Sequence, residues 1–200
     1  MAADPRPADP VARFQQLLAD AQSQPRERVP EPTAFALATV SAQGQPSVRM
    51  LLLKHADRDG FVFYTNLGSR KAGDLEATQR AAMCFHWSAL EIQVRVEGQV
   101  EPVTPQEADA YFATRPRGSQ IGAWASSQSR PIERPGDLES RVEEIERRFE
   151  GKDVPRPPHW SGFRLVPATI EFWHGKPSRL HVRHLYSRQG SAWRVETLYP

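Results

Sequence analysis

Cationic and hydroxyl side chains are concentrated in one stretch, residues 49–71, which reads RMLLLKHADRDGFVFYTNLGSRK. Four cations and two hydroxyls stand at the ends of its apolar runs: Arg49, Lys54, Tyr64, Thr65, Arg70 and Lys71. Cations placed beside the free backbone N–H groups of a helix N-terminus bind phosphate well. We therefore expect this stretch to build a site for a phosphorylated ligand.

The elements of this stretch should bring those side chains together. The apolar run from Met50 to Leu53 and the aromatic run from Phe61 to Thr65 favour two strands. Between them, Asp57 to Gly60 has the composition of a turn, and Ser69 is a candidate N-cap for a following helix. A hairpin would then gather the cations at one place. The alternative is that they are only solvated strand ends.

A second phosphate-binding pair is predicted further along the chain. Thr104 and Glu107 form a capping box that opens a helix, and Pro116 should stop it. Tyr111 and Arg115 are four residues apart, so they share a face near the end of this helix. A phenol beside a guanidinium can hold a phosphate, whereas the alternative is an ordinary surface pair.

Two segments follow this helix. Residues 119–129 mix amides, hydroxyls and aromatic groups with no clean period, and we expect them to line a pocket. Asp137 is expected to cap a further helix that packs on the barrel. The apolar stripe of that helix comprises Leu138, Val142, Ile145 and Phe149.

The last third of the chain carries a third cationic group. Residues 162–166, 168–173, 179–188 and 192–198 are expected to form strands. Arg179, His181 and Arg183 alternate, so a strand would place all three on one face. Side chains of this kind repel each other unless they meet an anion or an electron-rich ring. We therefore expect this face to contact a ligand.

Regular alternation and short connections predict the fold class. Ile92, Val94 and Val96 alternate with polar residues, as in a strand with one buried face. Five closely spaced strands indicate an antiparallel barrel with peripheral helices (mainly β, α+β) rather than a βαβ sheet. The predicted strands cover residues 33–40, 45–54, 61–65, 81–87 and 90–100. They follow a helix that should begin at Asp9-Pro10 and end near Ser23.

Composition bounds the function. The 200 residues fit a single domain over residues 31–200, after a tail, short helix and connector in residues 1–30, of which 1–8 should be disordered. A net charge of +2 does not favour nucleic acid. The single cysteine and scattered histidines do not suggest a metal site. With no bilayer-length apolar run and no signal peptide, we expect no membrane association and a cytoplasmic location.

From about Glu31 to Pro200 the chain resembles the pyridoxine/pyridoxamine 5′-phosphate oxidase family. The matching segments are EPTAFALATV, RMLLLKHADRDGFVFYTNLGSRK, LEIQV, YFATRPRGSQIGAWASSQS, WSGFRLVPATIEFW and RLHVRHLY. The resemblance implies an FMN-binding split β-barrel homodimer with the flavin at the interface. It also implies oxidation of pyridoxamine or pyridoxine 5′-phosphate to pyridoxal 5′-phosphate, with O2 as acceptor and H2O2 as product.

The resemblance also assigns residues. Its flavin-binding positions correspond to Arg49, Met50, Leu51, Leu52, Leu53, Lys54, Tyr64, Thr65, Arg70, Lys71, Gln93, Gln128, Ser129, Trp173 and Arg183. Its substrate-phosphate positions correspond to Lys54, Tyr111, Arg115 and Ser119. Its substrate-ring contacts and catalytic positions correspond to Arg179 and His181.

The chain departs from the family in two places. Val182 stands where the family motif RLHDR has an acid, and residues 1–30 show no counterpart of an Arg- and Tyr-bearing segment that helps to cover the substrate. One alternative is a flavin oxidase of the same fold that acts on another reduced ring, as in phenazine biosynthesis. Another is a non-catalytic flavin- or haem-binding barrel. The four substrate-phosphate positions favour the vitamin B6 substrate.

Overall fold

The computed structural model describes residues 8–200, so most of the tail expected to be disordered lies outside the described residues. Its helices are α1 (Pro10–Gln22), α2 (Arg70–Thr78), α3 (Pro105–Thr114), α4 (Arg117–Ala125) and α5 (Asp137–Arg148), with short 3-10 turns η1 (Ser88–Leu90) and η2 (Pro177–Arg179). Its strands are β1 (Ala34–Val40), β2 (Pro46–Leu52), β3 (His55–Asp57), β4 (Gly60–Asn66), β5 (Arg80–Trp87), β6 (Ile92–Pro102), β7 (Trp160–His174), β8 (Val182–Gln189) and β9 (Ala192–Leu198).

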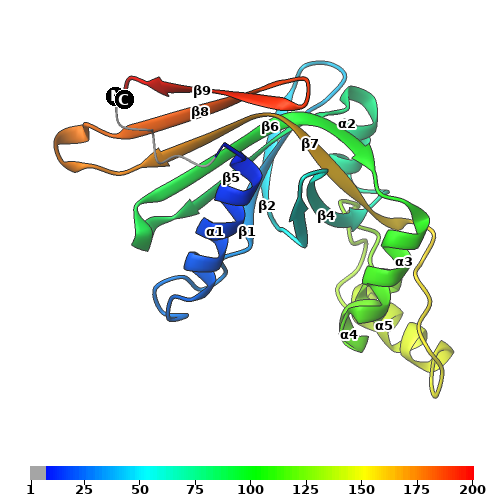
Figure 1. The fold of residues 1–200 in the computed structure, drawn as a ribbon. Helices are drawn as coiled ribbons and strands as arrows, with labels where there is room; N and C mark the ends of the chain where they lie inside the picture. Colours follow the sequence, from blue (N-terminus) through cyan, green and yellow to red (C-terminus); the bar gives the residue numbers. More distant parts are fainter. Residues whose placement is uncertain (1–7) are drawn as a thin grey trace.

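The nine described strands form one antiparallel sheet that curls into a split barrel (Figure 1). The strand order is β2-β1-β5-β6-β7-β4-β3, and β8 and β9 extend from β7. The two edges meet where the backbone N–H of Lys54 donates to the carbonyl of Val62 at 2.9 Å. The predicted antiparallel barrel with peripheral helices is therefore confirmed.

The predicted turn at residues 57–60 does close a hairpin onto β4, but the first strand of that hairpin is His55–Asp57 and not residues 50–53. β2 pairs with β1, and the hairpin partner of β4 is the three-residue strand β3. Lys54 directly precedes β3, and its bond to Val62 extends the β3–β4 hairpin, whereas β2 lies at the opposite edge of the sheet. The hairpin therefore brings Lys54 beside β4, as expected.

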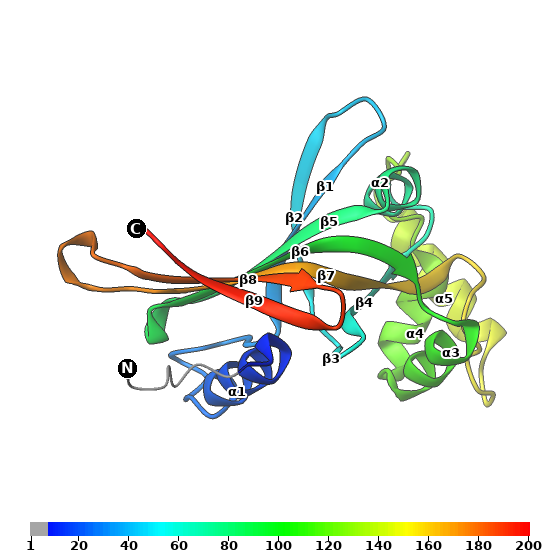
Figure 2. The ribbon, with the colours of Figure 1, turned by 45° about the horizontal axis from the view of Figure 1, so that its top comes forward.

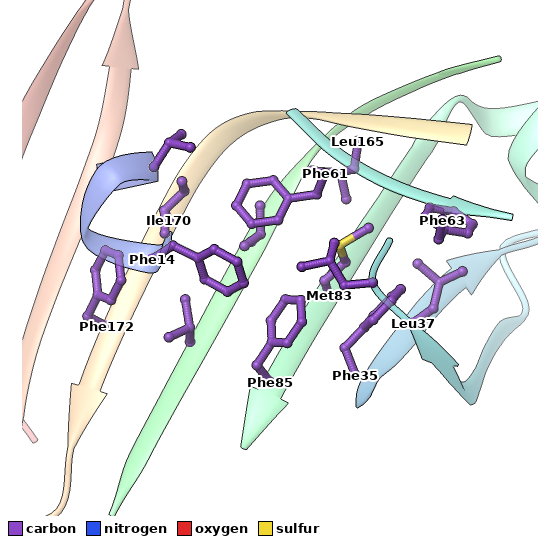
Figure 3. Close-up of a cluster of buried hydrophobic side chains, with 14 of the residues drawn as sticks. Phe14, Phe35, Leu37, Phe61, Phe63, Met83, Phe85, Leu165, Ile170 and Phe172 are labelled. Atoms are coloured by element: carbon purple, nitrogen blue, oxygen red, sulfur yellow. The ribbon is translucent and has the colours of Figure 1, made fainter. Parts of the chain in front are cut away.

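Helix α1 covers one side of the barrel core (Figures 2 and 3). It begins as predicted, since the Asp9 carboxylate accepts a hydrogen bond from the N–H of Val11 at 2.8 Å. Phe14 is fully buried, with its ring centroid 4.8 Å from that of Phe61 and 4.9 Å from that of Phe85. Burying aromatic side chains contributes strongly to core stability. The helix is therefore an integral part of the barrel core.

Helices α3, α4 and α5 build a second, smaller cluster beside the barrel. Helix α4 was not predicted, although Ile121 and Ala125 lie four residues apart and are both buried. Ile145 and Phe149 of the α5 stripe pack in this cluster and not on the barrel, which corrects the expectation. Helix α5 begins as predicted to within one residue, with Gly136 and not Asp137 at the N-cap.

Strand β7 is continuous over residues that were predicted as two strands. Pro167 suggested a break, because proline cannot donate to a ladder. In the structure Pro167 lies between the end of the β4 ladder at Leu165 and the start of the β8 ladder at Thr169. The β6–β7 register shifts between Glu97 and Gly98, so the bulge leaves Ala168 of β7 without a partner on β6. The proline is therefore tolerated within the strand.

The two ends of β7 lie in different parts of the molecule. Helices α3–α5 gather at its start, whereas the β7–β8 connection extends from its far end (Figures 1 and 2). No helix of the described residues has the length and apolar character needed to cross a bilayer.

Candidate functional site

A buried lysine forms the centre of the first group of predicted site residues. Lys71, in the first turn of α2, is only 8% exposed. Its Nζ donates to Thr65 Oγ1 at 3.1 Å, Ser69 Oγ at 3.3 Å and Gln128 Oε1 at 2.5 Å. Ser129 Oγ lies 3.5 Å from the backbone N of Arg70. The end of β4, the start of α2 and the segment after α4 thus meet here.

Arg49 lies beside this lysine on β2. Its guanidinium donates to Thr39 Oγ1 at 2.8 Å, to the Leu37 carbonyl at 3.2 Å and to Ser47 Oγ at 2.8 Å. Desolvation lowers the pKa of Lys71 to about 8, and the charge of Arg49 acts in the same direction. Desolvation also lowers the pKa of Arg49. Two cations held this close in a buried setting are suited to an anionic ligand.

The predicted phosphate clamp surrounds a stack of three aromatic rings. The ring of Tyr64 lies 4.2 Å from that of Tyr111 and 5.1 Å from that of Trp160, nearly parallel to both. The guanidinium carbon of Arg115 lies 4.8 Å from the Trp160 ring, and Lys54 Nζ lies 5.9 Å from the Tyr111 ring. These residues, together with Met50, Leu51, Leu52 and Ser119, line a cavity of about 480 Å³.

Arg115 contains an unpaired buried donor. Its Nη1 is buried without a hydrogen-bond partner, and desolvation lowers the pKa of the side chain. A buried N–H group without a partner costs about 1–3 kcal/mol, and more when it is charged. A ligand with acceptor oxygens in the adjoining cavity would remove this cost. The alternative that Arg115 and Tyr111 form only an ordinary surface pair is therefore not supported.

Ion pairing separates the predicted site cations from the other arginines. In the described part of the chain, no ion pair involves the following five: Arg49, Lys54, Arg70, Lys71 and Arg115. By contrast, Arg164 pairs with both Asp57 and Glu107. Lys54 and Arg70 are exposed, but Arg49, Lys71 and Arg115 are buried or half-buried, so solvation at strand ends does not explain these three.

The C-terminal group is arranged differently from the prediction. Arg179 lies in the turn η2 with φ of 61°, and β8 begins only at Val182, so Arg179 and His181 do not share a strand face with Arg183. The sequence Pro177-Ser178 starts this turn and prevents a longer strand. The predicted alternation over these three residues is therefore wrong.

His181 still reaches the expected neighbourhood by another route. Its ring packs 4.5 Å from that of Trp173, and its Nδ1 accepts a hydrogen bond from the Lys176 N–H at 3.2 Å. Gln93, Trp173 and Arg183 stand opposite one another on β6, β7 and β8. The structure therefore gathers Gln93, Trp173, His181 and Arg183 in one region.

The two groups are far apart within one chain. Tyr64 pairs with Gly162 near the start of β7, and Trp173 lies eleven residues further along the strand. At about 3.3 Å per residue, this path is roughly 36 Å. One chain therefore presents two separate parts of the predicted site. Sequence reasoning missed Trp160 and Glu171, which contact members of these groups.

Comparison with known families covers nearly the whole chain. A family model described as "Pyridoxamine 5'-phosphate oxidase" matches residues 21–149. A second, described as "Pyridoxine 5'-phosphate oxidase C-terminal dimerisation region", matches residues 160–200.

Curated relatives and a solved structure agree with these matches. The chain is 54% identical over 194 residues to a pyridoxine/pyridoxamine 5′-phosphate oxidase of Myxococcus xanthus, covering 97% of this chain and 93% of the relative. A protein of the same name from Anaeromyxobacter dehalogenans is 54% identical and covers 96% of each chain. The crystal structure of PhzG from Burkholderia lata superposes with a TM-score of 0.91 at 33% identity, covering 98% and 95% of the two chains. The chain thus belongs to the pyridoxamine 5′-phosphate oxidase family.

Proposed function

We propose that this chain is an FMN-dependent oxidase that converts pyridoxamine or pyridoxine 5′-phosphate to pyridoxal 5′-phosphate, with O2 as acceptor and H2O2 as product. The observation that carries the proposal is the unpaired Nη1 of Arg115, buried at a cavity that Lys54, Tyr111 and Ser119 also line. These groups suit a phosphate at one end of a small aromatic substrate. The names of the close relatives support the same substrate.

The cluster around Lys71 would hold the phosphate of FMN. Arg49 and Lys71 supply buried positive charge, and the first turn of α2 supplies backbone N–H groups. Thr65, Gln128 and Ser129 add polar groups at the same place. A terminal phosphate fits this donor set, and the similarity to a family with FMN-binding members supports FMN as the cofactor.

When bound, FMN would supply the redox chemistry, by taking a hydride from C4′ of the substrate and passing the electrons to oxygen. The chain supplies position. Lys54, Tyr111, Arg115 and Ser119 would hold the substrate phosphate at one end. Arg179 and His181 would hold the pyridine ring at the other end. Clamping both ends keeps the reacting atoms within near-attack range and excludes water.

A homodimer would complete each site. Because the two groups lie a strand apart in one chain, one protomer would supply the cation cluster and its partner the group around Trp173. The matched C-terminal dimerisation region supports this assembly. The apolar side chains of Val48 and Met50 on β2 are 67% and 64% exposed, which suits a surface that a second copy covers. FMN would then lie at the interface.

An oxidase acting on another reduced ring is the second candidate, favoured by the close superposition on PhzG. Anaerobic addition of pyridoxamine 5′-phosphate to the FMN-loaded protein separates the two. Loss of the oxidised flavin absorbance is expected. If neither phosphorylated B6 substrate bleaches the flavin, the B6 assignment is wrong and the ring-oxidase function replaces it. A protein that binds no flavin contradicts both.

A further inference from the structure

The buried carboxylate of Glu171 binds Arg183, one of the proposed flavin contacts. Glu171 on β7 is only 7% exposed, and no sequence pattern singled it out. Its Oε1 accepts from Arg183 Nε at 2.7 Å, and its Oε2 accepts from Arg183 Nη2 at 3.1 Å. This two-point contact fixes the plane of the guanidinium as well as its position. The side chain of Arg183 thus has little freedom on the sheet face.

The contacts of Arg183 leave part of its guanidinium available. An arginine has five N–H donors. Within the described residues, Glu171 takes two of them, and the Tyr199 carbonyl accepts one from Nη1 at 3.1 Å. Two donors remain for a ligand on the same face as Gln93 and Trp173, the neighbours of Arg183 across the sheet.

A second arginine shares the same carboxylate and provides an internal comparison. Arg95 Nη1 donates to Glu171 Oε2 at 3.3 Å, and its Nη2 pairs with Glu97. Glu97 therefore belongs to the same network but has no described contact with Arg183. Its side chain is 45% exposed, whereas that of Glu171 is 9% exposed. Removing either carboxylate removes one negative charge, yet only Glu171 touches Arg183.

We infer that Glu171 is a positioning residue, which holds the Arg183 guanidinium so that its two remaining donors meet the flavin. The inference rests on the proposed function, because it needs Arg183 to contact FMN. It adds a residue that contacts neither flavin nor substrate and acts only through Arg183. Buried charges are strongly destabilising when their partner is lost, so Glu171 is replaced by the isosteric amide in the test.

The experiment measures FMN affinity of the apoprotein by quenching of flavin fluorescence. Glu171→Gln should raise Kd about tenfold, the scale of one lost charge-assisted hydrogen bond. Glu171→Asp, which keeps the charge with a shorter reach, should give a smaller increase. The matched control Glu97→Gln should bind FMN as the wild type does. In the flavin-free protein, NMR of the Arg183 Nε–H should show faster exchange in Glu171→Gln than in Glu97→Gln.

A double-mutant cycle separates this role from a structural one. If Glu171 acts through Arg183, adding Glu171→Gln to Arg183→Met should weaken FMN binding no further. Additive effects would overturn the inference, as would wild-type affinity in Glu171→Gln while Arg183→Met is weakened. If Arg183→Met itself binds FMN normally, the proposed placement of Arg183 at the flavin fails, and the inference fails with it.

Discussion

The two ends of β7 present their cations in opposite ways. At the start of the strand, Lys71 and Arg115 are partly buried, have no ion-pair partner in the described residues and have lowered pKa values. At the far end, Arg183 is paired with Glu171, which raises its pKa, and Arg179 lies in an exposed turn. We propose that the first group is a cradle for anions, and that the second group contacts a ring system.

This contrast suggests that one region binds phosphate groups and the other binds aromatic rings. Phosphate groups need positive charge, and a buried cation without a partner binds them strongly. Aromatic rings need flat surfaces and a few directed hydrogen bonds, which Trp173, His181 and a paired arginine provide. Substrate and cofactor each have a phosphate end and a ring end. We infer that the two regions serve those two ends from different protomers.

The largest expected effect comes from mixing variants of the two regions. We predict that Lys71→Met/Arg115→Met and Arg179→Ala/His181→Ala are each nearly inactive alone, but regain activity when co-expressed. In a two-fold dimer, a mixed pair contains one intact site, so about a quarter of the sites recover in a random mixture. Steady-state assays of the co-expressed proteins measure this. Absence of recovery would show that each chain builds its own site.

The next largest effect concerns the cofactor end of the cradle. Lys71→Met should raise Kd for FMN about 10- to 100-fold, because a charge-assisted contact contributes roughly 1.5–3 kcal/mol. Fluorescence titration of the apoprotein measures the change. Lys152, which is exposed in the α5–β7 connection, provides the matched control as Lys152→Met. If Lys71→Met and Lys152→Met bound FMN with equal affinity, Lys71 would not be part of the FMN site.

The substrate end of the cradle should respond differently. Arg115→Met should raise KM for pyridoxamine 5′-phosphate about 10- to 100-fold while FMN stays bound. Because Nη1 is buried without a partner, the melting temperature of the ligand-free protein should not fall. Calorimetry and steady-state kinetics test both halves. A lower melting temperature with an unchanged KM would assign Arg115 to the fold rather than to the clamp.

The smallest effect is a pH dependence confined to the cradle. The pKa of Lys71 in the ligand-free protein is about 8, so its charge is present below that pH and lost above it. The FMN phosphate is a dianion throughout this range, since its second pKa is about 6. Kd for FMN should therefore rise about tenfold between pH 7 and 9.5. Lys71→Met should lack this dependence, and an equal slope in both proteins would contradict the assignment.

Local sequence patterns predicted local structure well. The alternation of Ile92, Val94 and Val96 places all three on the buried face of β6, and the Thr104–Glu107 capping box is present. Both depend on residues a few positions apart. The wrong prediction of a strand at Arg179 has the same origin. The alternating pattern of residue types extends into residues 179–181, but the chain there is a turn in which Ser178 has positive φ.

Non-local pairing explains what could not be predicted. The position of β7 between β6 and β4 follows from the order of strands in the whole barrel, which no short window contains. Pro167 is tolerated only because β4 ends before it and β8 starts after it. Trp160 and Glu171 gain their positions from contacts with distant residues, Arg115 and Arg183. The resemblance identified the candidate residues, and the structure supplied their neighbours.

The continuity of β7 would connect the two sites of the proposed homodimer mechanically. If each active site takes its cradle from one chain and its ring contacts from the other, then both ends of every β7 strand belong to different sites. A change in the twist of the strand would reach both. The bulge at Gly98 is the one irregularity on its long β6 border, and a Cβ there would lie 2.0 Å from the Val166 carbonyl oxygen. In the proposed dimer, this glycine would therefore help to set the bend of the strand that connects the two sites.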